Sequence, residues 1–140
     1  MALPALTQDY LFVLPLIAAR LADQVPDIPV EVVETADQVF AADKRAQVLM
    51  VMWGGEGIAQ LGRISAQRYL VLLGVQNVSP AKDARQTVAG PVMSQVHAAL
   101  NGWVPRGAVN KMRRATAAMR PDIRKDKALY PMGFELELSI

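Results

Sequence analysis

Cysteine is absent from this 140-residue chain, histidine occurs once, and only 6% of the residues are aromatic. The absence of cysteine excludes disulfides, Cys-ligated zinc or iron–sulfur centres and thiol nucleophiles. Because His97 is the single histidine, multi-histidine metal sites are excluded, and a Ser–His pair could use only that residue. No partner serine or carboxylate stands at a recognisable spacing from His97, so we expect a partly exposed surface side chain. The sequence therefore predicts no catalytic residue, no cofactor and no metal.

The chain does contain enough apolar material for a packed core, with 52% hydrophobic and 20% charged residues. Its length predicts a single domain over residues 1–140. The apolar run at residues 11–19 follows Asp9 rather than a basic residue, and it is far shorter than the roughly 20 residues that span a bilayer. We expect this run to be a core helix and the protein to have no membrane partner.

Apolar spacing predicts two principal helices. The first has Thr7 as its N-cap and runs to Gln24, and Pro15 either kinks it or lies at the start of a shorter helix. Its apolar face comprises Leu6, Tyr10, Val13, Leu14, Ile17 and Leu21. The second begins at Ser79 and Pro80, bends near Gly90 and ends at Asn101-Gly102. Its apolar stripe comprises Val88, Val92, Val96, Ala99 and Leu100.

Strands are predicted from β-branched and alternating apolar residues. Two buried strands, at residues 47–53 and 69–76, form a long antiparallel hairpin, with Met50, Met52 and Trp53 in the core of the first. A glycine-rich turn or loop at residues 54–57 follows the first strand and lacks the Lys-Ser/Thr pair of a phosphate-binding loop. Shorter strands are expected at residues 30–34 and 111–118. The clearest strand is at residues 130–140, where Phe134, Leu136, Leu138 and Ile140 alternate with Glu135, Glu137 and Ser139.

Charge is unevenly distributed along the chain. Residues 1–80 hold five basic and eight acidic residues, a net charge of −3, whereas residues 81–140 hold ten and five, a net charge of +5. The excess lies in residues 106–127, the basic segment, which comprises Arg106, Lys111, Arg113, Arg114, Arg120, Arg124, Lys125 and Lys127. Such a segment is typical of a nucleic-acid arm, a surface for an acidic partner, a head-to-tail contact between copies of one protein, or a solvated loop.

Two further patterns have solvated surface as the alternative to a binding site. Asp23, Asp27, Glu31 and Glu34 are close in sequence and could hold a divalent cation, but the intervening prolines prevent one helix face or strand from gathering them. The basic segment has the cations for phosphate contacts but no aromatic residue for stacking on bases. We therefore expect no sequence-specific reading of nucleic acid.

The order of elements resembles a known family. An N-terminal helix leads into "VPDIPVEVV", followed by the strands "QVLMVMWGG" and "QRYLVLLGVQN", the helix "AKDARQTVAGPVMSQVHAALNGWVP" and the strand "YPMGFELELSI". Nearly the whole chain resembles the tail terminator, or tail completion, proteins of long-tailed bacteriophages, including relatives in Mu-like prophages. With the element pattern, the resemblance implies an α+β fold: a mainly antiparallel sheet of four to five strands with two principal helices packed on one face.

What the resemblance implies is structural work rather than catalysis. Such proteins form a homo-oligomer, a hexameric ring that caps the tail tube, ends its polymerisation and joins the tail to the head connector. The implied partners are the tail tube protein and the head–tail connector protein, with DNA passing through the lumen without sequence-specific binding. The implied location is the head-proximal end of the virion tail, assembled in the host bacterial cytoplasm. The alternative is a small nucleic-acid-binding module that uses residues 106–127.

The basic segment is expected to face an acidic surface on a neighbouring subunit, the tube or the connector. We also expect residues 54–62 and 106–127 to be mobile in the free subunit and to become ordered on assembly.

Overall fold

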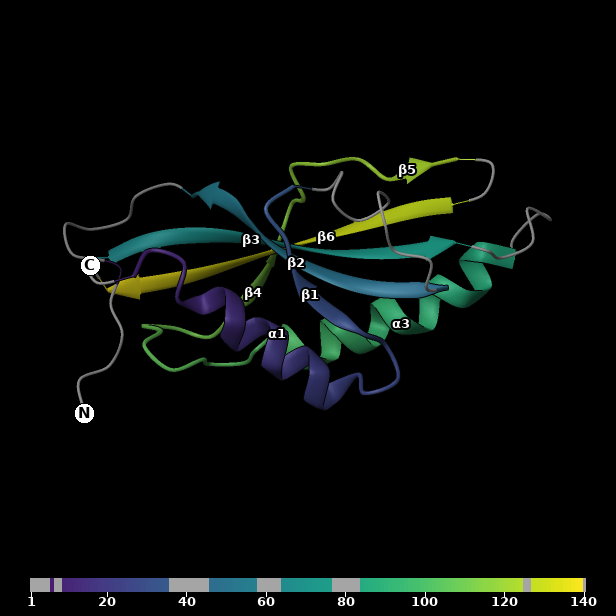
Figure 1. Cartoon of the computed structure of the whole chain (residues 1–140). Coiled ribbons are helices and arrows are strands. Elements are labelled where there is room, and N and C mark those ends of the chain that lie inside the picture. The colour runs from purple at the N-terminus through teal and green to yellow at the C-terminus, as the bar shows by residue number, and fades with distance from the viewer. Residues whose placement is uncertain are drawn as a thin grey trace.

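The computed structural model describes residues 6, 9–35, 46–57, 64–76, 84–124 and 127–139. Within them, two helices and six strands form the α+β fold that the sequence predicts, with one or two more strands than expected. The elements are α1 (Val13–Gln24), β1 (Val30–Val32), β2 (Gln47–Glu56), β3 (Ile64–Gln76), α3 (Ala84–Leu100), β4 (Arg113–Ala115), β5 (Asp122–Ile123) and β6 (Lys127–Ser139). The strand order is β1-β2-β3-β6-β4, and β5 also pairs with β6 (Figure 1). Among the described strands, every pairing except the parallel β1–β2 pair is antiparallel, which confirms the predicted sheet type.

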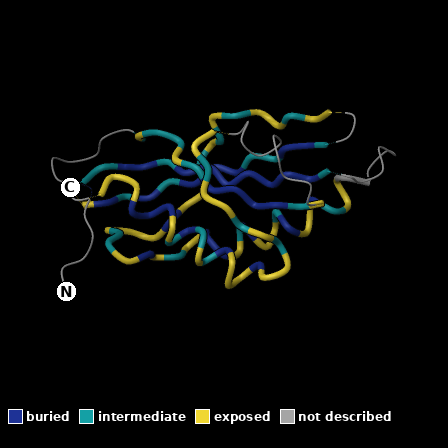
Figure 2. The backbone as a smooth tube through the Cα atoms, in the orientation of Figure 1, coloured by how far each residue is buried: buried dark blue, intermediate teal, exposed yellow. Residues whose placement is uncertain are grey.

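The long strands β2, β3 and β6 form the centre of the sheet. β3 pairs with β6 along its whole length, from Ile64 opposite Ser139 to Gln76 opposite Lys127. The apolar run within β3 is buried on both faces, as the dark central strands of Figure 2 show. Strands covered on both sides lose the polar alternation of a half-exposed strand, which explains the continuous hydrophobic pattern.

The predicted hairpin of β2 and β3 is confirmed, but its strands are longer than expected. β2 continues to Glu56, so Gly54 and Gly55 lie within a strand rather than in the predicted turn. The pairing register shifts between Trp53 and Gly55, and Gly55 has φ +100°. A bulge with a glycine in the left-handed region lets the strand bend here while its pairing continues. The connection between the two strands lies outside the described residues.

Both helices pack on the same face of the sheet (Figure 1). α1 begins at Val13, with Pro15 as its third residue, so the shorter of the two predicted helices is the one that forms. The predicted cap, Thr7, lies outside the described residues. Tyr10 precedes the helix and is 38% exposed, so its assignment to the apolar face was wrong. The other predicted face residues are buried: Leu6, Val13, Leu14, Ile17 and Leu21.

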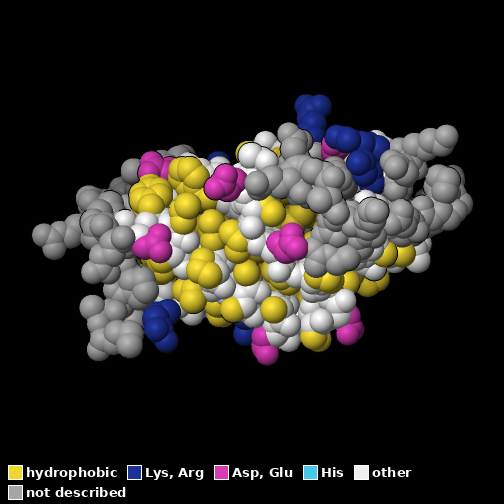
Figure 3. Space-filling view, in the orientation of Figure 1, with side chains coloured by type: hydrophobic (Ala, Val, Ile, Leu, Met, Phe, Trp, Pro, Cys, Tyr) yellow, Lys and Arg dark blue, Asp and Glu magenta, His cyan; other side chains and the backbone are white. Residues whose placement is uncertain are grey.

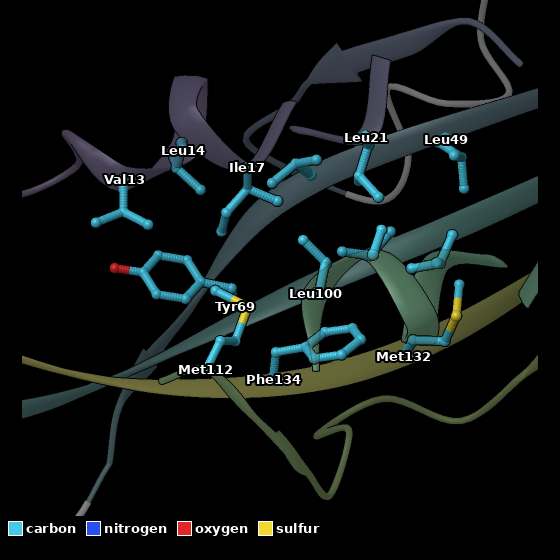
Figure 4. Packing of buried hydrophobic residues seen from close by; sticks show 14 of the residues in the cluster. Val13, Leu14, Ile17, Leu21, Leu49, Tyr69, Leu100, Met112, Met132 and Phe134 are labelled. Carbon is cyan, nitrogen blue, oxygen red and sulfur yellow. The ribbon is translucent and has the colours of Figure 1, made fainter. Parts of the chain in front are cut away.

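α3 runs through Pro91 to Leu100, and its predicted end is confirmed because Gly102 has φ +86°. The predicted start near Ser79 lies outside the described residues. Between the helices and the sheet lies the main core, in which side chains of α1 face Tyr69, Met112 and Phe134 (Figure 4). Tyr69 and Phe134 are 1% and 0% exposed, so the few aromatic residues of this face fill the centre of an otherwise aliphatic core.

The opposite face of the sheet carries a smaller buried cluster. Its buried members are Val48, Met50, Leu70, Leu72 and Leu129, against which Ala117 and Met119 pack from the segment after β4. The predicted closing strand is confirmed, with Phe134, Leu136 and Leu138 buried and the intervening glutamates half-buried. It begins at Lys127, three residues earlier than expected. Of the strand expected at residues 111–118, only β4 forms.

Candidate interaction surfaces

The basic segment runs along one edge of the sheet. Ala108 bridges to Leu138, and the backbone N–H of Val109 donates to the carbonyl of Glu137 at 2.9 Å. β4 and β5 then pair with β6 on its side away from β3. The structure therefore brings the predicted cations to one edge. Arg106, Lys111, Arg113, Arg114, Arg120 and Arg124 are exposed, Lys127 is half-buried, and Lys125 lies outside the described residues.

One of these cations is bound to carboxylates of its own sheet. Arg113 Nη2 lies 2.6 Å from Glu135 Oε1, and its Nη1 lies 3.2 Å from Glu137 Oε1. Arg68, on the neighbouring strand β3, also pairs with Glu135, with its Nε 3.3 Å from Oε2. The Glu135 side chain is only 12% exposed. The hydrogen bond from Arg113 is the main cause that holds the pKa of Glu135 below its usual range. Arg113 thus fastens β4 to β6.

The other cations divide into two groups. Arg124 pairs with Asp122 at 3.0 Å, within β5 and the residue that follows it. By contrast, four cations make no ion pair within the part of the chain that the structure describes: Arg106, Lys111, Arg114 and Arg120. Two apolar side chains are exposed near them, Val104 at 57% and Val109 at 44%. We define the basic edge as Val104, Arg106, Val109, Lys111 and Arg114.

His97 borders the core rather than standing free on the surface. Its ring centroid lies 5.3 Å from that of Phe134, and its Nδ1 is buried without a hydrogen-bond partner among the described residues. Burial, and then the nearby charge of Arg114, lower the pKa of His97. The sequence prediction of a partly exposed histidine holds for the ring as a whole, which is half-buried.

The acidic cluster considered in the sequence is not gathered into a site. Within the described ranges, no group of three or more His, Asp or Glu side chains is placed to hold a metal ion. One of its four carboxylates, Glu34, lines the groove described next.

The opposite edge of the sheet, at β1, carries an apolar groove. It has a volume of about 460 Å³ and is lined by Leu11, Leu14, Val32, Val33, Glu34 and Trp53. Leu11, Val32 and Trp53 are 44%, 47% and 37% exposed, and the 38% exposed Tyr10 stands beside them. Figure 3 shows hydrophobic side chains gathered on this face, interspersed with Asp and Glu. We define the groove as these six lining residues, with Tyr10 at its rim.

A buried polar network holds the aromatic wall of the groove. Gln67 is fully buried; its Oε1 accepts from Trp53 Nε1 at 2.9 Å, and its Nε2 donates to Tyr10 Oη at 3.1 Å and Ser65 Oγ at 2.8 Å. The Tyr10 hydroxyl in turn donates to Glu56. The rings of Tyr10 and Trp53 meet edge to face, with centroids 5.8 Å apart. The network therefore fixes two exposed rings, an arrangement suited to a preformed contact surface.

Sequence reasoning missed the groove because it placed Trp53 in the core. Met50 is buried as predicted and Met52 is half-buried, but Trp53 is at the surface. A signal was present: Trp53 directly precedes two glycines, which supply no side chains to cover an indole.

Trp103, by contrast, anchors the chain after α3. The backbone N–H of Trp103 donates to the Leu100 carbonyl at 3.1 Å. Its backbone carbonyl accepts from the Met112 N–H at 2.7 Å. The Arg20 guanidinium lies 5.6 Å from the centre of its ring. These contacts tie the loop of the basic edge to both helices.

Among the described residues, neither helix is long and apolar enough to cross a membrane.

The comparisons with known proteins agree with this architecture. A model of the phage tail terminator protein family matches residues 7–140. No curated protein matches the chain significantly. A solved structure with 13% sequence identity matches at a TM-score of 0.50, over 88% of this chain and 87% of the other, which indicates a shared fold.

Proposed function

Because the chain belongs to the phage tail terminator family, and is therefore a structural component of a phage tail, we propose that it forms a ring that caps the tail tube. The ring, which we expect to be hexameric, ends tube polymerisation and offers a surface to the head–tail connector protein. Its place is the head-proximal end of the tail, after assembly in the host cytoplasm. The observation that carries this proposal is the family match over residues 7–140.

The unlike edges of the sheet support ring formation. A closed ring of identical subunits is built from heterologous contacts, in which one patch meets a different patch on the neighbour. The groove and the basic edge are two such patches, separated by the full width of the sheet. A subunit with two identical edges would instead favour a two-fold dimer.

Electron microscopy of phage particles assembled without the protein tests the function. We expect tails of uncontrolled length, or tails that fail to join heads, and restoration of both properties by the wild-type chain. Normal tail length and normal joining in its absence would contradict the proposal.

The role of the basic segment is tested by charge reversal at Arg113, Arg114 and Arg120. We expect impaired ring formation or tail attachment, and unchanged assembly would overturn that role. Because Arg113 is bound to Glu135 and Glu137, the variant limited to Arg114 and Arg120 separates an assembly defect from a folding defect.

A second candidate, nucleic-acid binding, is favoured by the four cations that have no ion pair among the described residues. Phosphate contacts need only such cations, and their affinity falls steeply with salt. We expect the tail protein to show little DNA affinity, with DNA crossing the ring lumen without base-specific contacts. A salt-dependent, tight complex of the purified chain with duplex DNA would favour the second candidate.

A further inference from the structure

We infer that the groove at β1 receives the basic edge of a second copy of this chain. The inference rests on the proposed ring, and it names the two surfaces through which neighbouring subunits meet.

The exposed apolar side chains of the described residues support this pairing. Seven large hydrophobic side chains are exposed, and all lie near one of the two edges of the sheet. Tyr10, Leu11, Val32 and Trp53 surround the groove, Val104 and Val109 belong to the basic edge, and Ile123 lies in β5. Apolar groups gathered this way are typical of surfaces that another chain covers.

The shapes of the two surfaces are complementary in kind. The groove is a concavity of about 460 Å³, large enough for several aliphatic side chains. Val109 stands on backbone fixed to β6 by its hydrogen bond to Glu137, and the adjoining loop is tied down by Trp103. A concave apolar site held by the Gln67 network therefore has an exposed, anchored apolar counterpart on the same molecule.

The charges around the two surfaces are opposite. The groove is lined by Glu34 and bordered by Glu56, which binds Tyr10, and by Asp9, which accepts from the Leu11 N–H, whereas Val104 and Val109 are accompanied in sequence by Arg106, Lys111 and Arg114. Groove-to-groove contact would bring carboxylates together, and contact between two basic edges would bring cations together. Like charges disfavour both symmetric arrangements, so the head-to-tail arrangement remains.

A second copy is the occupant that these observations favour, because the complementary surface is present on this chain. Since the two surfaces lie at opposite sheet edges, each subunit can offer its groove to one neighbour and its basic edge to the other. Such a contact repeats and closes into a ring if the rotation per subunit permits it.

The absence of cysteine makes a direct test possible. Val32→Cys in the groove and Val109→Cys on the basic edge are prepared as separate variants, with Ser94→Cys on the exposed face of α3 as the matched control. The single-cysteine variants are mixed in pairs and treated with a short bifunctional maleimide, both as purified protein and in lysates that contain assembling tails. Covalent dimers are quantified on denaturing gels.

We expect the pair of Val32→Cys and Val109→Cys to yield several-fold more dimer than either variant alone and than the pair of Val32→Cys and Ser94→Cys. Equal yields in all pairs, in both settings, would overturn the inference, and so would a groove that cross-links only to another tail protein. Dimers of Val32→Cys alone that match the mixed pair would overturn it in favour of a symmetric contact.

Tail length in particles that lack the protein distinguishes failure of this inference from failure of the proposed function. Selective cross-linking with normal tails would leave the contact standing and remove the function. Uncontrolled tails without selective cross-linking would do the reverse.

Discussion

The two edges of this sheet are built from different materials. At β1, aliphatic side chains and two exposed aromatic rings form a groove whose polar support, Gln67, is buried. Along β6, the edge is a thin layer of short strands and loops that carries most of the positive charge. There Arg113 and Arg124 are committed to carboxylates of the same chain, whereas Arg106, Lys111 and Arg114 have no ion pair among the described residues. The number of cations in a segment is therefore a poor measure of the charge it offers to a partner.

The largest effect is expected from Gly133→Ala, which disturbs the packing of β4 against β6. A Cβ at Gly133 would lie 2.6 Å from the Ala115 carbonyl oxygen and 2.8 Å from the Ala117 nitrogen, both backbone atoms. Relieving this overlap requires β4 to move away from β6, and overpacking of this kind costs about 3 kcal/mol. Chemical denaturation measures the free energy of unfolding.

Gly90→Ala is the matched control, because a Cβ there meets nothing within 4 Å. In a helix this change is expected to stabilise the protein by about 0.5–1 kcal/mol. Equal unfolding free energies for the two variants would show that β4 is not held closely to β6.

A smaller effect is expected from Gln67→Leu, which removes the polar support of the groove. It removes the acceptor for Trp53 Nε1 and the donor to Tyr10 Oη, and each lost hydrogen bond contributes about 0.5–1.5 kcal/mol. The variant should also release Trp53, with a shift in its fluorescence. Gln95→Leu on the exposed face of α3 should change stability by no more than about 0.5 kcal/mol. A loss in Gln67→Leu no larger than in this control would contradict the supporting role of the network.

Glu135→Gln should cost less, about 1 kcal/mol, because Arg68 and Arg113 are partly exposed and solvent screens their charges. The effect depends on pH. The pKa of Glu135 is lowered in the folded protein, so its contribution is present above the unfolded pKa, about 4.3, and is lost as pH falls through the folded value.

The unfolding free energies of wild type and Glu135→Gln, measured from pH 7 down to acid pH, should therefore converge at low pH. Asp23→Asn, on the exposed face of α1, serves as the control. Its unfolding free energy should not show the convergence with wild type that is expected for Glu135→Gln. A difference between wild type and Glu135→Gln that persists at acid pH would contradict the ionic role of Glu135.

The smallest effect on stability is expected from Arg106→Glu combined with Lys111→Glu. Neither cation has an ion pair among the described residues, so unfolding should change by no more than about 0.5 kcal/mol. Cross-linking between groove and basic edge should nevertheless fall, and the wild-type reaction should weaken with added salt. A lower free energy of unfolding with unchanged cross-linking would show that Arg106 and Lys111 act in folding and not in the contact between copies.

The sequence predicted the parts of the fold that have a strong period. The alternation of Phe134, Leu136 and Leu138 identified β6, and the apolar run of β3 identified a buried strand, because burial directly selects these side chains. The end of α1 at Gln24 and the glycine cap of α3 were likewise predictable from local backbone chemistry.

The interaction surfaces were less predictable because tertiary contacts create them. β4 and β5 contain only three and two residues, and they form because β6 supplies an edge rather than because of their own composition. Whether residues 106–127 are mobile in the free subunit, as expected from the sequence, stays a prediction that hydrogen exchange in the subunit and in the assembly can test. Trp53 ends an apolar run in the sequence, and its place in the wall of the groove depends on contacts with Tyr10 and Gln67, which come from other segments of the chain.

Contact between the groove of one copy and the basic edge of the next is the basis of the inferred ring. It is tested most directly in a single chain that carries both Val32→Cys and Val109→Cys, treated with the bifunctional maleimide during assembly. We expect a ladder of covalent multimers that stops at the size of the ring. A product that stops at dimers, or a pattern no different from the Val32→Cys and Ser94→Cys double variant, would contradict it.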